Sequence, residues 1–531
     1  MEREFNLVEQ KWICVMTDDC KTEIISLHEL FLNAHKYAGL SGETKTQDFA
    51  VLRFLLAVIY TVFSRYDADG NEIDTTDDPD CLIDNWEKVF KSGAFPIKPF
   101  EKYFSVWYDR FWLFDDKYPF YQSNAVKGKC KMSSTAKMIG SLFESGNGPR
   151  LFSDRNDKGR LLSYPEAARW LLHIICFDDI AAKKPTPKRP WVGKLNLIAI
   201  KGRNLFETLM LNYNAECDSE NDVYTSKPSW EQNNELPQYN RIITIPDNQA
   251  ELLSLLSRRI WLNREDGNVN GYYLAGGDYF EDDEVFNEQM TLWRGYKESK
   301  KNTQLKFKPK FHDPSTKAWQ EFGSIAVINE NAENGLRTPG IIKWTNFLIK
   351  KKIISRDYLI NISTAAIIYN FAYPASLPVI DSISDTLSFH SQLLLDAGTA
   401  WRTKINYEIG CCAKTAKEIS KLSINLQKAA GADGDKLSGD DAKAQFYSMI
   451  DLPFRIWLEE LDTESDIDEY SQKIETEIKQ ISLSYGQELV SQLNASAIFG
   501  RSSKTLTSVS AFNIFNSAIN KIFSKEGDNN E

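Results

Sequence analysis

The sequence contains few metal-binding or redox-active side chains, and those present are scattered. Of its 531 residues, 8 are cysteine and 5 are histidine, and no two cysteines form a C-x-x-C pair. The adjacent Cys411 and Cys412 fall in a helical pattern, where neighbouring side chains point about 100° apart and do not converge on one metal ion. We therefore expect reduced structural thiols and no metal site.

The common catalytic motifs are also missing. The sequence has no G-x-x-x-x-G-K-[ST], G-x-G-x-x-G, G-x-S-x-G or H-E-x-x-H motif, so it predicts no phosphate-binding loop, nucleophile elbow or zinc protease site. The best acidic candidate for acid–base chemistry is Asp282-Asp283-Glu284, which is more typical of a solvated loop. These absences predict a protein with no catalytic residue and no cofactor. An enzyme that uses an unrecognised acidic site at Asp282–Glu284 remains an alternative.

Long apolar runs are lacking too. No stretch of about 18 uncharged apolar residues occurs, and the apolar Phe54–Phe63 is too short to span a bilayer. The start, Met1–Phe5, carries acidic residues where a signal peptide has a basic and then an apolar stretch. We expect a soluble, cytoplasmic protein with no membrane partner.

Positive charge is in deficit overall but is concentrated locally. The formal net charge is −11, which argues against a protein coated in nucleic acid. Ala181–Lys194, however, has five basic residues and no acid, and Lys297–Lys310 has six lysines and one acid. Such clusters can contact phosphates whatever the net charge is. The residues that we predict to bind DNA are Lys183, Lys184, Lys188, Arg189, Lys297, Lys300, Lys301, Lys350, Lys351 and Lys352. Alternatively, these runs are the solvated surface of a protein-only scaffold.

The chain is too long for one ordinary core, and its pattern changes near residue 380. Before that point, short strand and helix patterns alternate. After Asp381, helical periodicity dominates, which is typical of an antiparallel helix bundle. The four predicted helices are Leu387–Leu426, Asp440–Leu461, Ile467–Leu489 and Leu506–Phe523. We predict an α+β fold, with a large mixed α/β N-terminal domain over residues 1–380 and a C-terminal four-helix bundle over residues 381–531.

Several shorter elements are predicted within the first domain. Ser26 caps a helix over Leu27–His35, with Glu29 at the capping-box position, and Ser163 caps a helix that ends near Phe177. From Tyr239 to Ile368 the pattern favours strands. Its strand predictions include Gly271–Ala275, Ser324–Ile328 and Tyr358–Tyr369.

One polar segment breaks all periodicity. Glu144–Arg160 holds three glycines and a proline, so we predict an exposed loop. Phe152 lies within it, and an aromatic ring on a loop can stack on an unpaired base. The alternative is that Phe152 anchors the loop into its own domain.

Eight short sequence blocks can be compared, in their order and spacing along the chain, with those of known protein families. They are Phe5–Val15 (FNLVEQKWICV), Ser26–Phe31 (SLHELF), Thr46–Ala57 (TQDFAVLRFLLA), Pro119–Gln122 (PFYQ), Glu166–Leu172 (EAARWLL), Asn204–Asn212 (NLFETLMLN), Arg258–Leu262 (RRIWL) and Pro453–Trp457 (PFRIW). In order and spacing these blocks resemble the CasA family, the large subunits of Cascade, the type I-E CRISPR surveillance complex.

The resemblance implies a non-catalytic role in antiviral defence. A CasA-like protein recognises the protospacer-adjacent motif in duplex DNA, helps to open the duplex and contacts the 5′ end of the guide RNA. The implied partners are CRISPR guide RNA, double-stranded target DNA, the other Cascade subunits, and a helicase-nuclease or another nuclease subunit. Guide pairing would supply most of the sequence specificity, as in other RNA-guided complexes.

Two family features correspond to segments already noted. The family loop that meets guide RNA and neighbouring subunits corresponds to Glu144–Arg160, where the resemblance implies contacts by Arg150, Phe152 and Arg155. A glycine-rich family loop that enters the minor groove falls near Ala181–Val192. Here that segment has lysines and prolines instead, so motif preference is expected to differ.

Two further family features are altered. The motif-reading lysine falls shortly before Trp293, where this chain has Asp282–Glu284; Lys297, Lys300 or Lys301 are the possible substitutes. The family's strand wedge, which usually bears glutamine, falls near Tyr369–Ser376. Here the wedge residues would be Asn370, Tyr373, Pro374 and Ala375, because an aromatic ring and a proline can separate a base step as apolar wedges do. The alternative for this segment is a buried turn.

Overall fold

The computed structural model divides the chain into two compact units. The first comprises Met1–His312, Asn329–Leu348 and Asn361–Thr386, and the second comprises Asp313–Ile328, Ile349–Ile360 and Leu387–Glu531. The structure describes residues 3–73, 81–139, 160–179, 189–216, 227–232, 239, 241–298, 304–327, 335–372, 377–432, 437–493 and 506–524. The predicted domain boundary at residue 380 stays a prediction.

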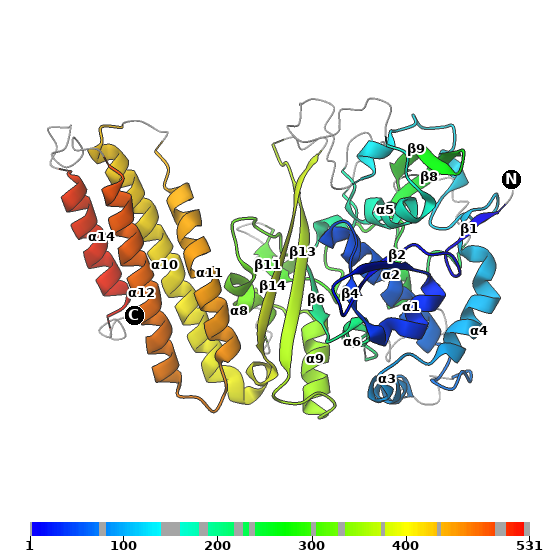
Figure 1. Cartoon of the computed structure of the whole chain (residues 1–531), viewed down its shortest axis with the longest axis horizontal. Coiled ribbons are helices and arrows are strands. Elements are labelled where there is room, and N and C mark those ends of the chain that lie inside the picture. The colour runs from blue at the N-terminus through cyan, green and yellow to red at the C-terminus, as the bar shows by residue number, and fades with distance from the viewer. Residues whose placement is uncertain are drawn as a thin grey trace. The chain divides into compact units, whose positions relative to one another are not determined.

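The first unit mixes helices and strands, and Figure 1 shows their arrangement. Its helices are α1 (Leu27–Asn33), α2 (Lys45–Phe63), α3 (Cys81–Ser92), α4 (Ile97–Trp107), α5 (Tyr164–Phe177), α6 (Leu205–Asn212), α7 (Gln249–Leu253) and most of α9 (Gly340–Lys350). Its strands are β1 (Glu4–Asn6), β2 (Ile13–Thr17), β3 (Thr22–Ile25), β4 (Tyr37–Leu40), β5 (Trp112–Phe114), β6 (Leu197–Lys201), β7 (Arg241–Ile242), β8 (Arg258–Glu265), β9 (Asn268–Gly276), β10 (Asp278–Tyr279), β11 (Trp293–Lys297), β12 (Leu305–Pro309), and most of β13 (Leu359–Tyr369) and β14 (Val379–His390).

Helix α2 is the core of this unit. It begins after Thr44, whose side chain accepts a hydrogen bond from the backbone of Gln47, and it contacts α4, α5, α6 and α7. By length and composition α2 could cross a membrane, but its whole apolar window is buried inside the protein. An all-round apolar helix is expected when other elements surround it.

The helix starts follow their capping residues. Ser26 and Glu29 form the predicted capping box, and α1 ends at Asn33, two residues earlier than predicted. Helix α5 begins directly after Ser163 and ends at Phe177, as predicted.

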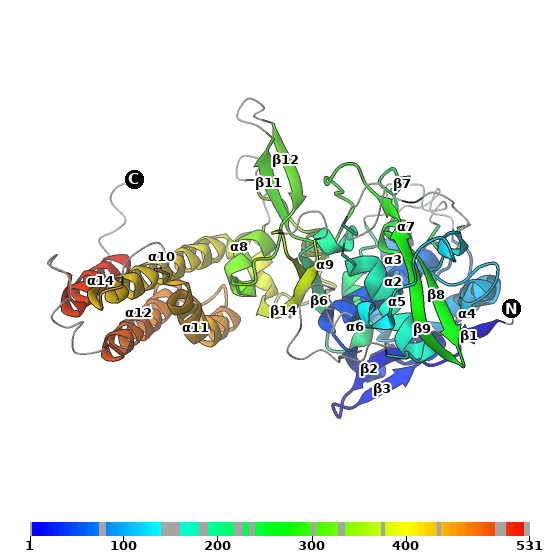
Figure 2. The ribbon, with the colours of Figure 1, turned by 90° about the horizontal axis from the view of Figure 1, so that it is seen from above.

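Small sheets complete the unit. β2 lies between β3 and β4, and β13 lies between β14 and β6. β8 and β9 form an antiparallel hairpin whose turn residues, Asp266 and Gly267, both have positive φ (49° and 75°), as a type I′ hairpin turn requires. The hairpin formed by β11 and β12 stands out from the other strands of the unit (Figure 2).

The strand-rich prediction for Tyr239–Ile368 is only partly correct. Gly271–Ala275 lies in β9 and Leu359–Tyr369 is β13, which confirms two predicted strands. The prediction of a strand over Ser324–Ile328 is wrong, because Phe322–Ile325 forms the short helix α8. Helices α7 and α9 also lie within this stretch.

Four long helices form a bundle in the second unit, side by side in Figure 1. They are α10 (Thr399–Ala429), α11 (Asp440–Glu460), α12 (Ile467–Ser491) and α14 (Ser508–Ile522). The predicted helix start at Leu387 is wrong: Leu387 and Phe389 are buried while Ser388 and His390 are half-buried, which is the two-residue period of strand β14. Cys411 and Cys412 are both buried in the bundle.

Candidate nucleic-acid interface

Arg189, a predicted DNA-binding residue, lies among aromatic rings. Its guanidinium carbon is 4.7 Å from the ring centre of Phe311 and 5.7 Å from the ring centres of Tyr369 and Phe371. A cation within about 6 Å of a ring centre is attracted to the ring face. Burial lowers the pKa of Arg189. We call Arg189, Phe311, Tyr369 and Phe371 the anchor cluster; all four belong to the first unit.

The anchor cluster holds the chain just before residues 180–188. The hydroxyl of Tyr369 donates to the carbonyl oxygens of Phe177 (3.2 Å) and Asp178 (3.4 Å), at the end of α5. Arg258 Nε lies 2.7 Å from the carboxylate of Asp178, and the Arg258 side chain is only 2% exposed. These buried contacts fix the residues that precede the segment.

The chain is equally fixed after residues 180–188. Trp191 Nε1 donates to Glu288 Oε2 (2.9 Å), and the backbone N–H of Trp191 donates to Ser257 Oγ (3.3 Å). Glu288 is paired in turn with Arg53 of the core helix α2. Both flanks of the lysine-rich segment are therefore held by buried polar contacts. The predicted Lys183, Lys184 and Lys188 themselves lie outside the described residues.

The hairpin β11–β12 presents one basic face. In its register Arg294 lies opposite Lys308 and Tyr296 lies opposite Lys306, so all four side chains share a face. Lys308 Nζ is 4.3 Å from the ring centre of Tyr296, and Lys306 Nζ is 2.7 Å from a carboxylate oxygen of Glu298. Our sequence-based choice did not include Arg294, Lys306 or Lys308, although the alternation of charged and apolar residues in this run could have identified them.

The other predicted basic residues are placed as follows. Lys297 is exposed at the end of β11, and Lys300 and Lys301 lie outside the described residues. Lys350, Lys351 and Lys352 are exposed at the end of α9. The last three belong to the second unit, whereas the anchor cluster belongs to the first.

The acidic residues Asp282–Glu284 make structural contacts. Asp283 pairs with Lys194 (2.6 Å), and Asp282 Oδ1 accepts from the backbone N–H of Asp283 (2.7 Å). Glu284 accepts from the backbone N–H of Phe307 in β12 (2.8 Å), so this carboxylate holds the basic hairpin. Within the described residues no group of three or more histidine, cysteine or acidic side chains is placed to hold a metal ion.

The predicted wedge begins at the end of β13. The backbone N–H of Asn370 donates to the carbonyl oxygen of Pro378 (2.9 Å). Its side-chain oxygen accepts from the backbone of Ala372 (3.0 Å). Asn370 therefore closes the base of the connection between β13 and β14. Tyr373, Pro374 and Ala375 lie outside the described residues.

The residues that flank the predicted guide-RNA loop are paired with strand β9. Before residues 140–159, Ser133 exchanges backbone hydrogen bonds with Tyr272 of β9 (2.8 and 3.0 Å), and after them Leu162 does the same with Val269 of β9 (3.0 and 2.8 Å). Both flanks are therefore paired to one strand. The predicted contact residues Arg150, Phe152 and Arg155 lie outside the described residues.

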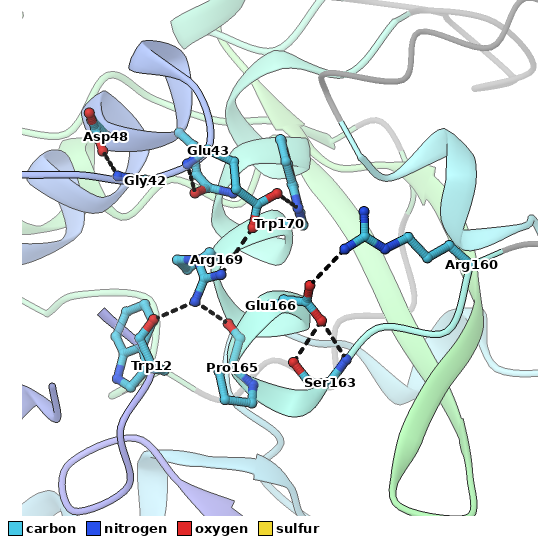
Figure 3. Close-up of polar contacts among 11 residues, drawn as sticks. Trp12, Gly42, Glu43, Asp48, Arg160, Ser163, Pro165, Glu166, Arg169 and Trp170 are labelled. Carbon is cyan, nitrogen blue, oxygen red and sulfur yellow. Dashed lines mark hydrogen bonds and ion pairs between the residues drawn. The ribbon is translucent and has the colours of Figure 1, made fainter. Parts of the chain in front are cut away.

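Figure 3 shows how the chain passes from this loop into α5. Arg160 pairs with Glu166 in the first turn of the helix (3.2 Å). The other oxygen of Glu166 accepts from the backbone N–H (2.9 Å) and the hydroxyl (2.7 Å) of Ser163. The Glu166 carboxylate thus joins Arg160, the last residue of the predicted loop, to the start of α5.

The next turn of α5 is tied to earlier parts of the chain (Figure 3). Arg169 donates to the carbonyl oxygen of Trp12 (2.8 Å) and to Glu43 Oε1 (3.0 Å), and Trp170 Nε1 donates to Glu43 Oε2 (2.8 Å). Glu43 lies in the turn before α2. These contacts therefore join the first turns of α5 to Trp12 and to the turn before α2.

Comparison with known proteins gives a consistent result. A family model described as CRISPR-associated protein Cse1 matches residues 6–485. The curated CasA/Cse1 protein of Thermus thermophilus is 29% identical over 240 residues, which are 43% of this chain and 42% of that protein. In this match the chain spans less than half the length of that relative.

Solved structures extend the likeness over nearly the whole chain. The crystal structure of Thermobifida fusca Cse1 superposes with a TM-score of 0.82 at 25% identity and covers 98% of each chain. Thermus thermophilus CasA has a TM-score of 0.71 at 16% identity, covering 98% of this chain and 99% of the other. A chain in a structure described as a CRISPR RNA-guided surveillance complex also has a TM-score of 0.71, at 13% identity, covering 98% and 100%. The last two show a shared fold.

Proposed function

The chain belongs to the Cse1 (CasA) family of CRISPR-associated proteins, and on that premise we propose that it is a subunit of type I-E Cascade, a CRISPR RNA-guided surveillance complex. The observation that carries this proposal is the family match over residues 6–485. Guide RNA, double-stranded target DNA and the other Cascade subunits are then its partners. Its place of action is the cytoplasm, where these partners meet.

Within that complex, the subunit recognises the protospacer-adjacent motif and helps to open the duplex. Two segments with predicted DNA contacts support this role, because each adjoins or contains a member of the anchor cluster. Residues 180–188 end next to Arg189, and the wedge segment contains Phe371. Strand β12, which carries Lys306 and Lys308 of the basic hairpin face, ends shortly before Phe311. Because the anchor cluster supports these segments together, motif contacts and strand separation could act on neighbouring base pairs.

The predicted loop over Glu144–Arg160 would contact the guide RNA and a neighbouring subunit. Its two flanks are fixed on β9, so the loop is presented by a rigid support. A fixed support favours binding because less conformational entropy is lost when the loop is ordered.

The subunit itself does no chemistry in this proposal and presents the opened DNA to a nuclease partner. The engagement of Asp283 with Lys194 and of Glu284 with the hairpin backbone supports this view. A carboxylate that already holds structure is less available as a general acid or base.

The first experiment is co-purification. The tagged chain is expressed with its genomic neighbours, and nucleic acid is extracted from the purified sample. We expect several co-eluting subunits and one short RNA of uniform length. Phe152→Ala should reduce RNA recovery, whereas Leu161→Ala, which removes an exposed apolar side chain beside the same loop, should not. A lone chain without RNA would contradict the proposal.

The second experiment tests DNA recognition. The assembled complex is incubated with duplexes that carry a matching target and a randomised flanking sequence, and the bound pool is sequenced. Enrichment of a short motif beside the target is expected. Equal binding of all flanking sequences would contradict motif recognition but leave the assignment to the surveillance complex intact.

A further inference from the structure

A small surface pocket lies just beyond the end of helix α4 in the first unit. Its wall includes two cationic side chains, Arg110 and Lys117, together with Tyr118, Asn124 and Trp230. The pocket interior has room for about one water molecule. None of these residues is among the DNA, RNA or wedge contacts predicted from the sequence. The proposed function therefore gives this pocket no role.

The guanidinium of Arg110 is held in place at the pocket. Its central carbon lies 3.6 Å from the ring centre of Tyr118 and 5.8 Å from that of Trp107, where a cation is attracted to an aromatic face. Its Nη1 donates to the carbonyl oxygen of Gln232 (3.3 Å). This is the only hydrogen bond of the Arg110 side chain to a residue that the structure describes. Most of the five N–H groups of the guanidinium are therefore available to a ligand.

Lys117 brings a second positive charge to the same aromatic ring. Lys117 is exposed, and its Nζ lies 4.8 Å from the ring centre of Tyr118. The carboxylate of Asp115 fixes the backbone here, because its Oδ1 accepts from the backbone N–H groups of Lys117 and Tyr118 (2.6 Å each). Two positive charges on one ring repel each other, and an anion near both would offset that repulsion.

The chain supplies no counter-charge to this pair of cations. Asp109 and Asp115, which lie nearby in the chain, both pair with Arg3, at distances of 2.6 and 2.7 Å. In the part of the chain that the structure describes, Arg110 and Lys117 form no ion pair. The missing anion can therefore come from another molecule.

The surroundings of the pocket favour a protein carboxylate over a nucleic-acid phosphate. Asp109 directly precedes Arg110, Asp116 directly precedes Lys117, and both acids are exposed. Exposed acids beside each cation weaken attraction for a phosphate backbone. Val106, in the last turn of α4, is 67% exposed. Arginine and aromatic residues beside an exposed apolar side chain are typical of a protein–protein interface.

We propose that this pocket binds the side-chain carboxylate of an aspartate or glutamate on a neighbouring protein subunit of the complex. Arg110 is the principal contact, since its planar guanidinium can donate two parallel hydrogen bonds to one carboxylate. Lys117 adds a second charge beside the Tyr118 ring. The inference rests on the proposed function and deepens it, because it identifies an interaction surface on the first unit and the chemistry of the partner.

Crosslinking tests the identity of the ligand. A water-soluble carbodiimide joins a lysine amine to a carboxylate when the two groups are in contact. The assembled complex is treated with this reagent, and its crosslinked peptides are identified by mass spectrometry. We expect Lys117 to be joined to an acidic residue of one other subunit. Lys117→Arg keeps the charge but has no reactive amine, so this crosslink should disappear while the complex assembles as before.

Affinity measurements test the contribution of Arg110. The labelled full chain is titrated into the complex formed by the remaining subunits. Arg110→Glu should bind about 10-fold or more weakly, as expected when a central interface residue is lost. Replacing the crosslinked acid of the partner by lysine should restore most of the affinity of Arg110→Glu, because the two charges are then exchanged.

The matched control is Lys127→Glu. Lys127 is also exposed and lies against an aromatic ring, with its Nζ 4.5 Å from the ring centre of Trp261, but it does not line the pocket. This variant should bind with wild-type affinity. Thermal unfolding checks that each variant is folded. Lys117→Glu, a change at an exposed position, provides the same test of affinity should Arg110→Glu be unfolded.

The opposite results are equally specific. A Lys117 crosslink confined to its own chain, or wild-type affinity of the folded Arg110→Glu and Lys117→Glu variants, would refute this interface and leave the proposed function intact. Loss of guide RNA from Arg110→Glu with every protein subunit retained would show that the pocket binds phosphate, and would also refute it. A wild-type chain that joins neither protein subunits nor RNA would refute the proposed function together with this inference.

Discussion

Arg53 and Glu288 form a bidentate ion pair inside the first unit, with Nη1–Oε1 and Nη2–Oε2 distances of 2.8 and 2.9 Å. Each side chain is only 1% exposed. Trp191 donates to the same carboxylate, so this pair connects the core helix α2 with the base of the lysine-rich segment. Desolvation offsets much of the attraction within such a buried pair, but one partner left alone would keep an uncompensated charge inside the protein.

Removal of one partner should therefore be costly. Arg53→Met leaves the charge of Glu288 buried and unpaired, and we expect a loss of about 3–5 kcal/mol in the free energy of unfolding, measured by urea denaturation. The control is Lys473→Met. Lys473 pairs with Glu460 at the surface, where the two side chains are 61% and 45% exposed, and its removal should cost less than about 1 kcal/mol. Equal losses in the two variants would contradict this account.

A second prediction concerns pH and the bundle. Burial of Glu408, whose side chain is 0% exposed, raises the pKa of this carboxyl to about 7. Lys404 opposes that shift, but it is shared: its Nζ lies 3.0 Å from Glu408 and 3.2 Å from Glu475. Because the folded pKa exceeds the unfolded value of 4.5, the protonated form stabilises the bundle, and stability should fall as pH rises from about 4.5 through about 7.

The substitution Glu408→Gln tests this directly. At pH 8 the free energy of unfolding of the variant should exceed that of the wild type by on the order of 2 kcal/mol, and the variant should unfold at a higher temperature. The difference should shrink towards pH 5. Glu460→Gln is the matched control, because Glu460 forms an exposed pair with Lys473. A wild-type protein whose stability does not change between pH 5 and 8 would show that Glu408 stays charged throughout.

A third prediction concerns the exposed lysines at the end of α9. If Lys350, Lys351 and Lys352 bind DNA phosphates in the complex, replacing all three by alanine should weaken binding about equally for all DNA sequences. It should also reduce the salt slope by about 0.9 for each phosphate that is no longer neutralised. The control replaces three exposed lysines on helices α3 and α4, namely Lys88, Lys91 and Lys98. An unchanged slope in the first variant would identify its lysines as solvated surface.

A fourth prediction separates the subunit from the enzyme alternative. Replacing Asp282 and Asp283 by asparagine and Glu284 by glutamine removes the ion pair with Lys194 and weakens the support of β12. We expect the free energy of unfolding to fall by about 1–3 kcal/mol. We expect no change in metal-dependent cleavage of duplex DNA. A cleavage activity of the isolated wild-type chain that disappears in this variant would favour the enzyme.

The sequence predicts elements whose determinants are local. Ser26 and Glu29 identify the start of α1 because the capping box lies within a few residues of the helix it begins. Helix α9 was missed within a stretch predicted to be strand-rich, because a short apolar run such as Gly340–Lys350 is ambiguous between helix and strand. The false helix start at Leu387 has the same origin.

The candidate site could be predicted only in part. Its charged residues stand out in the sequence because lysine runs without acids are a local pattern. The aromatic environment of Arg189 could not be inferred, since Phe311, Tyr369 and Phe371 are far away in the chain and only the folded structure brings them together. For the same reason the sequence alone does not distinguish Phe371 from the nearby Tyr373.

The pairing of Ser133 and Leu162 with β9 bears on how the segment between them can vary among related proteins. Because Ser133 and Leu162 both pair with β9, the two ends of the loop are held close together whatever lies between them. Closing a loop twice as long between such ends costs only about 0.6 kcal/mol more. The segment should therefore be exchangeable: a chimera that carries a foreign insert of another length should fold normally. If the segment has the RNA and subunit contacts proposed above, the chimera should also acquire the RNA and subunit preference of the donor.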